Sequence, residues 1–288
     1  MSWPTVARKD FQDAIRSRAL WALTVLYVLF MAGFAYLFSL LNSGGGPEEL
    51  VGADLVFFLV GPTALLVPLT ALIIGYKSLA GEVESGSAKF LLGLPHTRRD
   101  ALIGKWVGRA AVLAVSILVG IVLSVVVVIT LYDQPSLDTI GLFTLLALFL
   151  GVVYVGIAVG LSGLTNSTSR ATVYAAAFFV IFEVVWDFVP NLVWYLTNGS
   201  FFPPRAAGPA GASFDAPGWY FLLGNLSPTS AFSSALTAFA PGRSLSVQPV
   251  FEGGLPFYLT GPANVALMLA WLLLALALGY RRFREADL

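Results

Sequence analysis

Six apolar runs of about 20 residues each constrain the fold of this chain more than any other feature. A helix of that length crosses the roughly 30 Å hydrocarbon core of a bilayer. Only 11% of the 288 residues are charged and 58% are hydrophobic, whereas soluble domains average about 25% and about 45–50%. The sequence therefore predicts an all-α polytopic membrane protein with a single transmembrane domain, residues 1–288. The six predicted spans are Ala19–Leu41, Leu55–Tyr76, Ala110–Tyr132, Leu142–Leu164, Ala171–Pro190 and Gly261–Tyr280.

The positive residues predict the orientation of these spans. If the N-terminus is cytosolic, 14 of the 16 Lys and Arg residues lie in cytosolic segments. Cytosolic loops of membrane proteins carry such an excess of positive charge. We therefore expect a multi-pass protein of the plasma (cytoplasmic) membrane with both termini in the cytosol. The two exceptions, Arg205 and Arg243, fall in the long extracytoplasmic loop, residues 191–260.

The N-terminal segment, residues 3–18, has the pattern of an amphipathic helix. Trp3, Phe11 and Ile15 fall on one helical face, and charged residues such as Arg8 fall on the other. A basic amphipathic helix beside a span is typical of the membrane interface, so we expect this helix to lie in the interface plane. A solvated cytosolic lead-in is the alternative.

The extracytoplasmic loop, residues 191–260, is too long for a turn and is rich in aromatic residues and proline. Aromatic side chains gather at membrane–water interfaces, so we expect the loop to pack on the membrane surface or at the outer mouth. Ser227-Pro228-Thr229 can cap a short helix that runs through Ala238. Other continuous helix or strand patterns are missing, which argues against an independently folded domain.

The cytosolic segment between spans two and three, residues 77–109, is a charged arm between two apolar runs. Apolar residues recur on one helical face of this arm: Leu79, Val83, Phe90, Leu91 and Leu94. Glycines interrupt the pattern, which predicts short helical pieces, and Pro95 ends them. Thr97 and Asp100 then have the spacing of a capping box, so we expect a new helix to start there and continue into span three.

An amphipathic helix between two spans can lie on lipid or enter a groove on a soluble partner. Glu82 and Glu84 favour the protein partner, because anionic lipid headgroups repel carboxylates. An ordinary solvated loop that only sets the topology is the alternative.

The residues Gly81–Pro95 (GEVESGSAKFLLGLP), followed by Arg98-Arg99 and Gly104-Lys105, resemble the segment between spans two and three in permease subunits of type II ABC exporters. The resemblance implies that this segment is a coupling helix, docked in a cleft of a separate ABC ATPase subunit. It also implies that two permeases, expected here as a homodimer, pair with two copies of the ATPase. A second, smaller cytosolic contact is implied at residues 166–169.

The coupling residues that the resemblance implies divide by their chemistry. Polar contacts to the ATPase would come from Glu82, Glu84, Lys89, Arg98 and Arg99. The groove of the ATPase would be filled by Phe90, Leu91 and Leu94. The segment is completed by Ser85, Gly86 and Pro95. A related branch, involved in maturing the copper enzyme nitrous oxide reductase, has a similar architecture and stays open, as does the substrate.

The sequence lacks the Gly-x-x-x-x-Gly-Lys-(Ser/Thr) motif that cradles ATP phosphates. We therefore expect a transporter subunit that is not an enzyme and binds no cofactor directly, with ATP and magnesium bound by the partner ATPase. Without cysteine, and with one histidine and three methionines, the chain has few ligands for a soft metal. The expected partners are the ATPase, a second permease copy and membrane lipids, and no nucleic acid.

Two carboxylates interrupt the apolar pattern of span five. Glu183 lies past its middle, and Asp187 follows four residues later on the same helical face. A charge inside the membrane costs about 2.5–3.5 kcal/mol, so such residues face other helices or a water-filled path. We expect the pair to line a translocation path or gate. Alternatively, Asp187 marks the outer interface and Glu183 bonds to a neighbouring helix.

Two further functions stay compatible with the sequence. A secondary transporter or channel driven by an ion gradient would use Glu183 and Asp187 as ion sites. A structural membrane subunit would anchor a soluble partner and move nothing.

Small residues and prolines mark two of the spans. Span four has closely spaced small residues from Gly151 to Gly160, which favours tight helix packing, within the chain or between two copies. In span two, Pro62 and Pro68 free backbone carbonyls and permit kinks.

Overall fold

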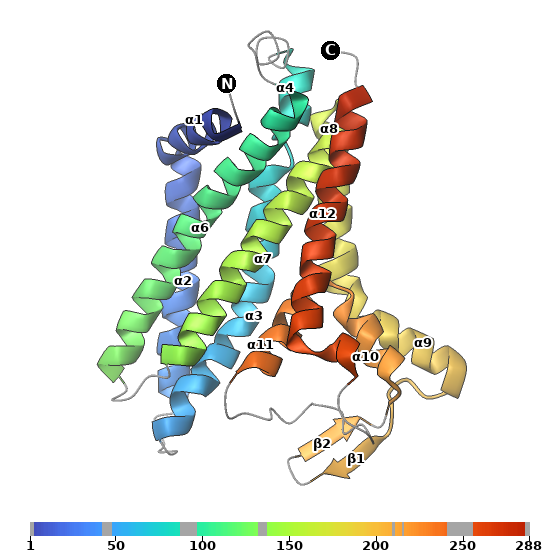
Figure 1. Ribbon diagram of the computed structural model, residues 1–288. Helices are drawn as coiled ribbons and strands as arrows, with labels where there is room; N and C mark the ends of the chain where they lie inside the picture. Colours follow the sequence, from blue (N-terminus) through green and yellow to red (C-terminus); the bar gives the residue numbers. More distant parts are fainter. Residues whose placement is uncertain are drawn as a thin grey trace. The chain divides into compact units, whose positions relative to one another are not determined.

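The computed structural model describes residues 3–41, 48–86, 97–131, 137–208, 211–214, 216–240 and 256–285. In these ranges the regular structure is helical apart from one two-stranded hairpin (Figure 1). Six of the described helical stretches are long and apolar enough to span a membrane. The predicted all-α polytopic fold with six spans is therefore confirmed.

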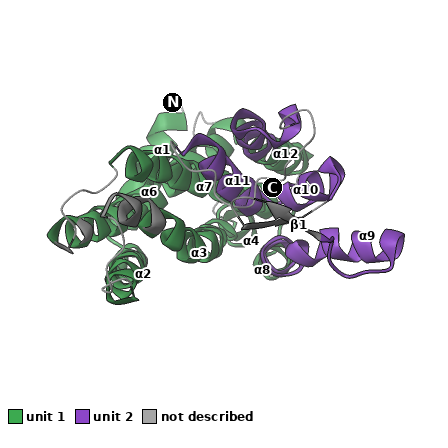
Figure 2. Ribbon diagram, turned by 90° about the horizontal axis from the view of Figure 1, so that it is seen from below, with its two compact units in different colours: residues 1–177, 271–288 green, residues 178–270 purple. Residues whose placement is uncertain are grey.

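The chain divides by its internal contacts into two compact units (Figure 2). The first unit, residues 1–177 and 271–288, contains α1 (Trp3–Ile15), α2 (Arg18–Leu41), α3 (Glu48–Gly75), α4 (Ala80–Glu84), α6 (Arg98–Leu131), α7 (Leu137–Gly163), most of α8 (Thr168–Phe179) and the C-terminal part of α12 (Gly261–Glu285). The second unit, residues 178–270, contains the π-helix η1 (Val180–Val185), the 3₁₀ helix η2 (Trp186–Phe188), α9 (Val189–Asn198), β1 (Arg205–Gly208), β2 (Gly211–Phe214), α10 (Gly218–Asn225), α11 (Pro228–Phe239), the 3₁₀ helix η3 (Phe257–Leu259) and the start of α12.

Within the first unit, α2 packs along α6, α3 packs along α7, and α6 also packs on α7. The most buried side chains at these contacts include Tyr27, Leu113, Ile117 and Tyr154. The hydroxyl groups of Tyr27 and Thr70 are hydrogen-bonded at 2.8 Å between α2 and α3. Lipid offers no hydrophobic drive for helix association, so close packing and hydrogen bonds of this kind hold the helices together.

The helix α3 continues through both of its prolines, Pro62 and Pro68. Next to them, the hydroxyl groups of Thr63 and Thr70 donate to carbonyls four residues earlier, at 2.7 Å and 2.6 Å. These acceptors are the carbonyls of Leu59 and Leu66, and not those of Phe58 and Ala64, which lose their backbone donor at the prolines. The helix ends at Gly75, where the arm predicted between spans two and three begins.

The small residues of α7 pack inside the chain. A Cβ atom added at Gly156 would overlap the side chain of Leu272, and one at Gly160 would overlap the backbone of Ala275. Gly163 lies in the same way against the backbone of Gly279. The small-residue seam therefore brings α7 against α12, with backbones close enough that larger residues do not fit.

Span five is longer and less regular than the sequence predicts. The helical run continues past the predicted span end at Pro190, from Thr168 to Asn198. Pro190 lies in the first turn of α9, where a missing N–H removes no helical hydrogen bond. The run ends at Gly199, whose φ of 73° is the left-handed conformation typical of a helix C-terminus.

The loop after span five contains more regular structure than predicted. The helix α11 starts after Ser227 as expected and ends at Phe239, one residue beyond the predicted Ala238. The expectation that other helix and strand patterns are missing is wrong, because α10 and the hairpin of β1 and β2 also form here. In the hairpin Arg205 pairs with Phe214 and Gly208 pairs with Gly211. These elements are only four or eight residues long, too short for a clear periodic signal.

The change Gly160→Val tests the seam between α7 and α12. Because the added atoms would overlap Ala275, we expect a loss of about 1–3 kcal/mol of stability. The matched control is Gly141→Val on the same helix, where no atom lies within 4 Å of the added Cβ. Thermal unfolding of both variants in one detergent provides the measurement. Equal melting temperatures would contradict the close approach of α7 and α12.

Candidate functional site

The first part of the arm that the sequence predicts to be cytosolic comprises residues 76–86, which we call the arm base. A turn at 76–79 leads into the short helix α4, Ala80–Glu84. Gly86 follows, with a φ of 74°. This short helix followed by a glycine agrees with the short helical pieces that the sequence predicts. The rest of the predicted coupling helix lies outside the described residues, including Lys89, Phe90, Leu91, Leu94 and Pro95.

A serine from another helix caps α4. The N–H groups of Leu79 and Ala80 both donate to the hydroxyl oxygen of Ser162 on α7, each at 3.1 Å. Leu79, the residue at the N-cap position, makes no side-chain cap of its own. The first N–H groups of a helix need such an acceptor. All three residues are buried, so this hydrogen-bond pair fixes the start of the arm to α7.

A buried ammonium group joins the arm base to two other helices. Lys105 on α6 lies 2.7 Å from Oε1 of Glu82 on α4 and 3.3 Å from Oδ1 of Asp10 on α1. Only 9% of the Lys105 side chain is exposed. A charge this deeply buried is tolerated only when it is paired. Lys105 therefore holds α1, α4 and α6 together at one point.

Arg109 extends the same cluster by one turn of α6. Its Nε lies 3.5 Å from Oδ2 of Asp10, and its Nη1 donates to the backbone carbonyl of Ile74. Ile74 is in the last turn of α3, where carbonyls have no partner within the helix. A cation that binds such a carbonyl also interacts favourably with the helix dipole. Arg109 therefore connects the end of span two to α1 and α6.

The predicted N-terminal helix exists as α1, and only part of its apolar face packs on α6, because Trp3 and Ile15 are 40% and 43% exposed. Val6 and Ala7 are buried. They approach the backbone of α6 at Gly104 and Gly108, where an added Cβ would meet Val6 and the carbonyl of Ala7. The backbone N–H of Trp3 donates to Asp100 on α6 at 3.1 Å. The location of α1 in the membrane interface stays a prediction.

The other end of the arm base reaches the turn before α8. The carboxylate of Glu84 accepts a hydrogen bond from the backbone N–H of Thr168 at 2.8 Å. Thr168 is the first residue of α8, and a helix N-terminus attracts negative charge. Residues 166–169 are also the second cytosolic contact that the family resemblance implies. The two predicted partner-facing segments are therefore in direct contact with each other.

The helix that returns the arm to the membrane starts as the sequence predicts. Asp100 Oδ2 accepts from the Thr97 N–H at 3.1 Å, and the Asp100 N–H donates to the Thr97 hydroxyl oxygen at 3.1 Å, which is a capping box. Arg98 donates through Nη1 to the carbonyls of Phe283 and Arg284, both at 2.7 Å, at the end of α12. Among the other predicted coupling residues, Ser85 and Arg99 are exposed.

Glu183 and Asp187 lie in different surroundings within the second unit. Glu183 is half-buried in η1 and accepts a hydrogen bond from the Thr229 hydroxyl at 2.9 Å. Asp187 is exposed, and its backbone carbonyl accepts from the Asn191 side chain. Residues 180–188 are π-helical and then 3₁₀-helical, so the α-helical spacing that places both carboxylates on one face does not apply. Their role in a path stays a prediction.

A second set of polar side chains in this unit was not predicted from the sequence. The Asn225 amide donates to the Asn264 side chain at 3.1 Å and accepts from the Ser234 hydroxyl at 2.9 Å. Asn264 is buried in the first turn of α12. The sequence signal that could have indicated this set is Asn264, a polar residue inside the apolar run of span six. Among the described ranges, no group of three His, Asp or Glu side chains gathers where a metal ion could bind.

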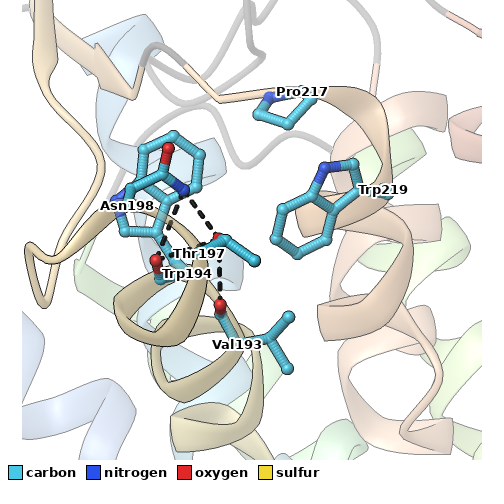
Figure 3. A pocket seen from close by; sticks show the side chains of 6 residues that line it. All are labelled: Val193, Trp194, Thr197, Asn198, Pro217 and Trp219. Atoms are coloured by element: carbon cyan, nitrogen blue, oxygen red, sulfur yellow. Dashed lines mark hydrogen bonds between the residues drawn. The ribbon is translucent and has the colours of Figure 1, made fainter.

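The second unit also has an aromatic pocket of about 490 Å³ between α9 and α10 (Figure 3). Trp219 and Pro217 form one side, and Val193, Trp194, Thr197 and Asn198 form the other. The Asn198 amide is held by the Thr197 hydroxyl at 2.7 Å. Next to this pocket the Tyr220 hydroxyl donates to Asn191 at 2.8 Å, and burial raises the pKa of Tyr220.

The change Lys105→Met tests the buried ion cluster. Breaking a buried pair leaves carboxylates unpaired, so we expect a loss of about 3–5 kcal/mol and faster amide hydrogen exchange in α1. Lys9→Met, at an exposed position of α1, is the control and should change neither quantity. In the double variant Asp10→Asn/Lys105→Met the loss should be smaller than the sum of the two single losses. Additive losses would show that Asp10 and Lys105 do not interact.

The change Ser162→Ala tests the cap on α4. Two buried N–H groups would lose their acceptor, at about 1–3 kcal/mol for each unsatisfied group. We expect a lower melting temperature and faster exchange at residues 79–86. Ser39→Ala removes an exposed serine hydroxyl from a helix and serves as the control. Unchanged exchange at the arm base would rule out Ser162 as its anchor.

Comparison with known proteins identifies the family. Residues 4–288 match the family model for ABC-2 family transporter proteins. A relative from Stutzerimonas stutzeri, described as a probable ABC transporter permease protein NosY, is 29% identical over 294 residues, 97% of each chain. A Pseudomonas aeruginosa protein of the same description is 30% identical over 203 residues, 69% of this chain and 73% of the relative. The chain therefore belongs to the ABC-2 transporter family and is a multi-pass membrane subunit of an ABC transporter.

Proposed function

We propose that this chain is the permease of an ATP-driven exporter and that its cytosolic arm transmits the motion of a separate ATPase subunit to the spans. Both termini would lie in the cytosol, in the cytoplasmic membrane. The observation that carries this proposal is the cluster around Lys105, which ties the arm base to α1 and α6. A loop that served only to set the topology would not need a buried ion cluster.

The contacts of the arm base define the route that the motion would take. Glu82 is bound to Lys105 on α6, the N–H groups of Leu79 and Ala80 are bound to α7, and Glu84 is bound to the start of α8. A partner that displaces the segment after Gly86 would therefore pull on three helices together. Arg109 extends the connection to the end of α3.

The energy for this motion would come from the partner. The sequence has no phosphate-binding glycine loop, and ABC transporters of this family are assembled from permease and ATPase parts. ATP and magnesium would be bound by the ATPase, and this chain would bind neither. The residues in contact with the ATPase would include the apolar Phe90, Leu91 and Leu94.

We further propose a homodimer of permeases with two ATPase copies. Span five supports this, because many of its large apolar side chains have no cover within the described residues. Val173, Val184 and Phe188 are 63%, 53% and 60% exposed. A second copy or lipid can cover such a surface. Glu183 and Asp187, in the same span, would line the path of the substrate.

The double change Leu91→Asp/Leu94→Asp tests the docking model. Charged side chains cannot fill an apolar groove, so we expect the variant to lose the ATPase during co-purification from detergent-solubilised membranes while its melting temperature stays unchanged. The control is Leu137→Asp, an exposed leucine at the predicted outer end of α7.

Two results would contradict the proposal. The first is full retention of the ATPase by the Leu91→Asp/Leu94→Asp variant, which would exclude the arm as the docking element. The second is substrate transport in sealed vesicles without ATP, which would favour a gradient-driven transporter.

A further inference from the structure

The first unit contains a cavity of about 820 Å³ whose position in the fold suggests a ligand other than the transported substrate. It is lined by α1, α2, α3 and α6 and by the turn after α3. The volume is in the range of about 300–1,000 Å³ that is typical of small-molecule sites. The cavity lies at one end of the spans, because α2 starts at Arg18 and α3 ends at Gly75.

The lining of this cavity is apolar in one part and charged in the other. Leu23 and Leu26 of α2, Ile73 of α3 and Val112 of α6 supply an apolar wall inside the spans. Asp13 of α1 and Lys77 of the arm base supply charges beyond the ends of the spans. A site with this division matches an amphiphile that has a charged headgroup and a hydrocarbon body.

Two of the charged side chains at the cavity form an ion pair with each other, and two are in no ion pair and can contact a ligand. Asp10 and Arg109 are paired with each other at 3.5 Å. Among the described residues, Asp13 and Lys77 take part in no ion pair within 4.0 Å, and both are exposed. Lys77 also attracts the exposed carboxylate of Glu84, without direct contact. The Lys77 ammonium lies 5.3 Å from the centre of the Tyr76 ring, which orients it. The available charges are therefore one carboxylate and one ammonium.

We propose that this cavity binds one phospholipid whose headgroup carries both a phosphate and an ammonium group. The phosphate binds Lys77, and the headgroup ammonium binds Asp13, which matches the two available charges one to one. The acyl chains lie along Leu23, Leu26 and Ile73. An anionic headgroup without an ammonium would leave Asp13 facing a negative charge. This inference goes beyond the proposed function, since the lipid is a bound component and not the cargo.

The site has a structural consequence for the arm. Asp10 and Arg109 line the cavity and also belong to the ion cluster around Lys105. A lipid in the cavity therefore stabilises the same helices that hold the arm base. Binding to the folded state only should raise the melting temperature with lipid concentration.

Native mass spectrometry of the purified full chain in detergent tests the proposal. The probes are phosphatidylethanolamine and phosphatidylglycerol with identical acyl chains. We expect one phosphatidylethanolamine per chain, in preference to phosphatidylglycerol. Lys77→Gln and Asp13→Asn should each weaken binding about fivefold, the effect of about 1 kcal/mol per headgroup charge contact.

The variants Leu26→Trp and Ala22→Trp fill the cavity from α2 and should abolish binding. Leu29→Trp makes the same leucine change one turn away, at a position that is 65% exposed, and should bind lipid like the unmodified chain. Equal binding by Leu26→Trp and Leu29→Trp would overturn the site. Equal binding of both lipids would overturn the proposed headgroup. Since all variants are compared by melting temperature without lipid, a folding defect is distinguished from a loss of binding.

Discussion

The ammonium group of Lys105 lies between two carboxylates from helices far apart in the sequence. Asp10 approaches from α1 and Glu82 from α4, at 3.3 Å and 2.7 Å. If either helix moved away from α6, Lys105 would lose one of its two carboxylate partners. An ammonium group that is nearly buried is energetically costly when it loses its partners. The remaining contacts of the arm base, through Ser162 and Thr168, fix its position further. The mechanical role proposed for the arm depends on this stiffness, because a flexible arm would absorb the motion of a partner.

Close backbone packing makes the ion cluster possible. Asp10 reaches α6 because Gly108 has no side chain, and the carbonyl of Ala7 also approaches this glycine. Between α7 and α12, Gly160 and Gly163 likewise allow a close approach of the two backbones. Small residues in membrane helices allow short distances, and short distances give polar contacts their strength. The electrostatic and steric parts of the first unit are therefore interdependent.

The sequence predicts features that depend on local signals and misses those that depend on tertiary contacts. The six spans follow from apolar length, the capping box from the spacing of Thr97 and Asp100, and the start of α11 from Ser227. The cap from Ser162 comes from 83 residues away along the chain, and no local pattern encodes it. Charge pattern alone suggested that Glu82 and Glu84 are available to a partner, whereas Lys105 and the Thr168 N–H bind them. The π-helix at 180–185 is likewise invisible to α-helical periodicity.

The absence of cysteine allows a direct test of the coupling between ATPase and permease, because one introduced thiol can be labelled alone. A spin label at Ser85→Cys, an exposed position of the arm base, would report the distance between the two permease copies of the proposed complex with the ATPase. Pulsed electron paramagnetic resonance measures this distance with and without ATP and magnesium. Transmission through the arm base predicts a shift in the distance distribution on ATP binding. An unchanged distribution, in a complex that hydrolyses ATP and transports, would contradict it.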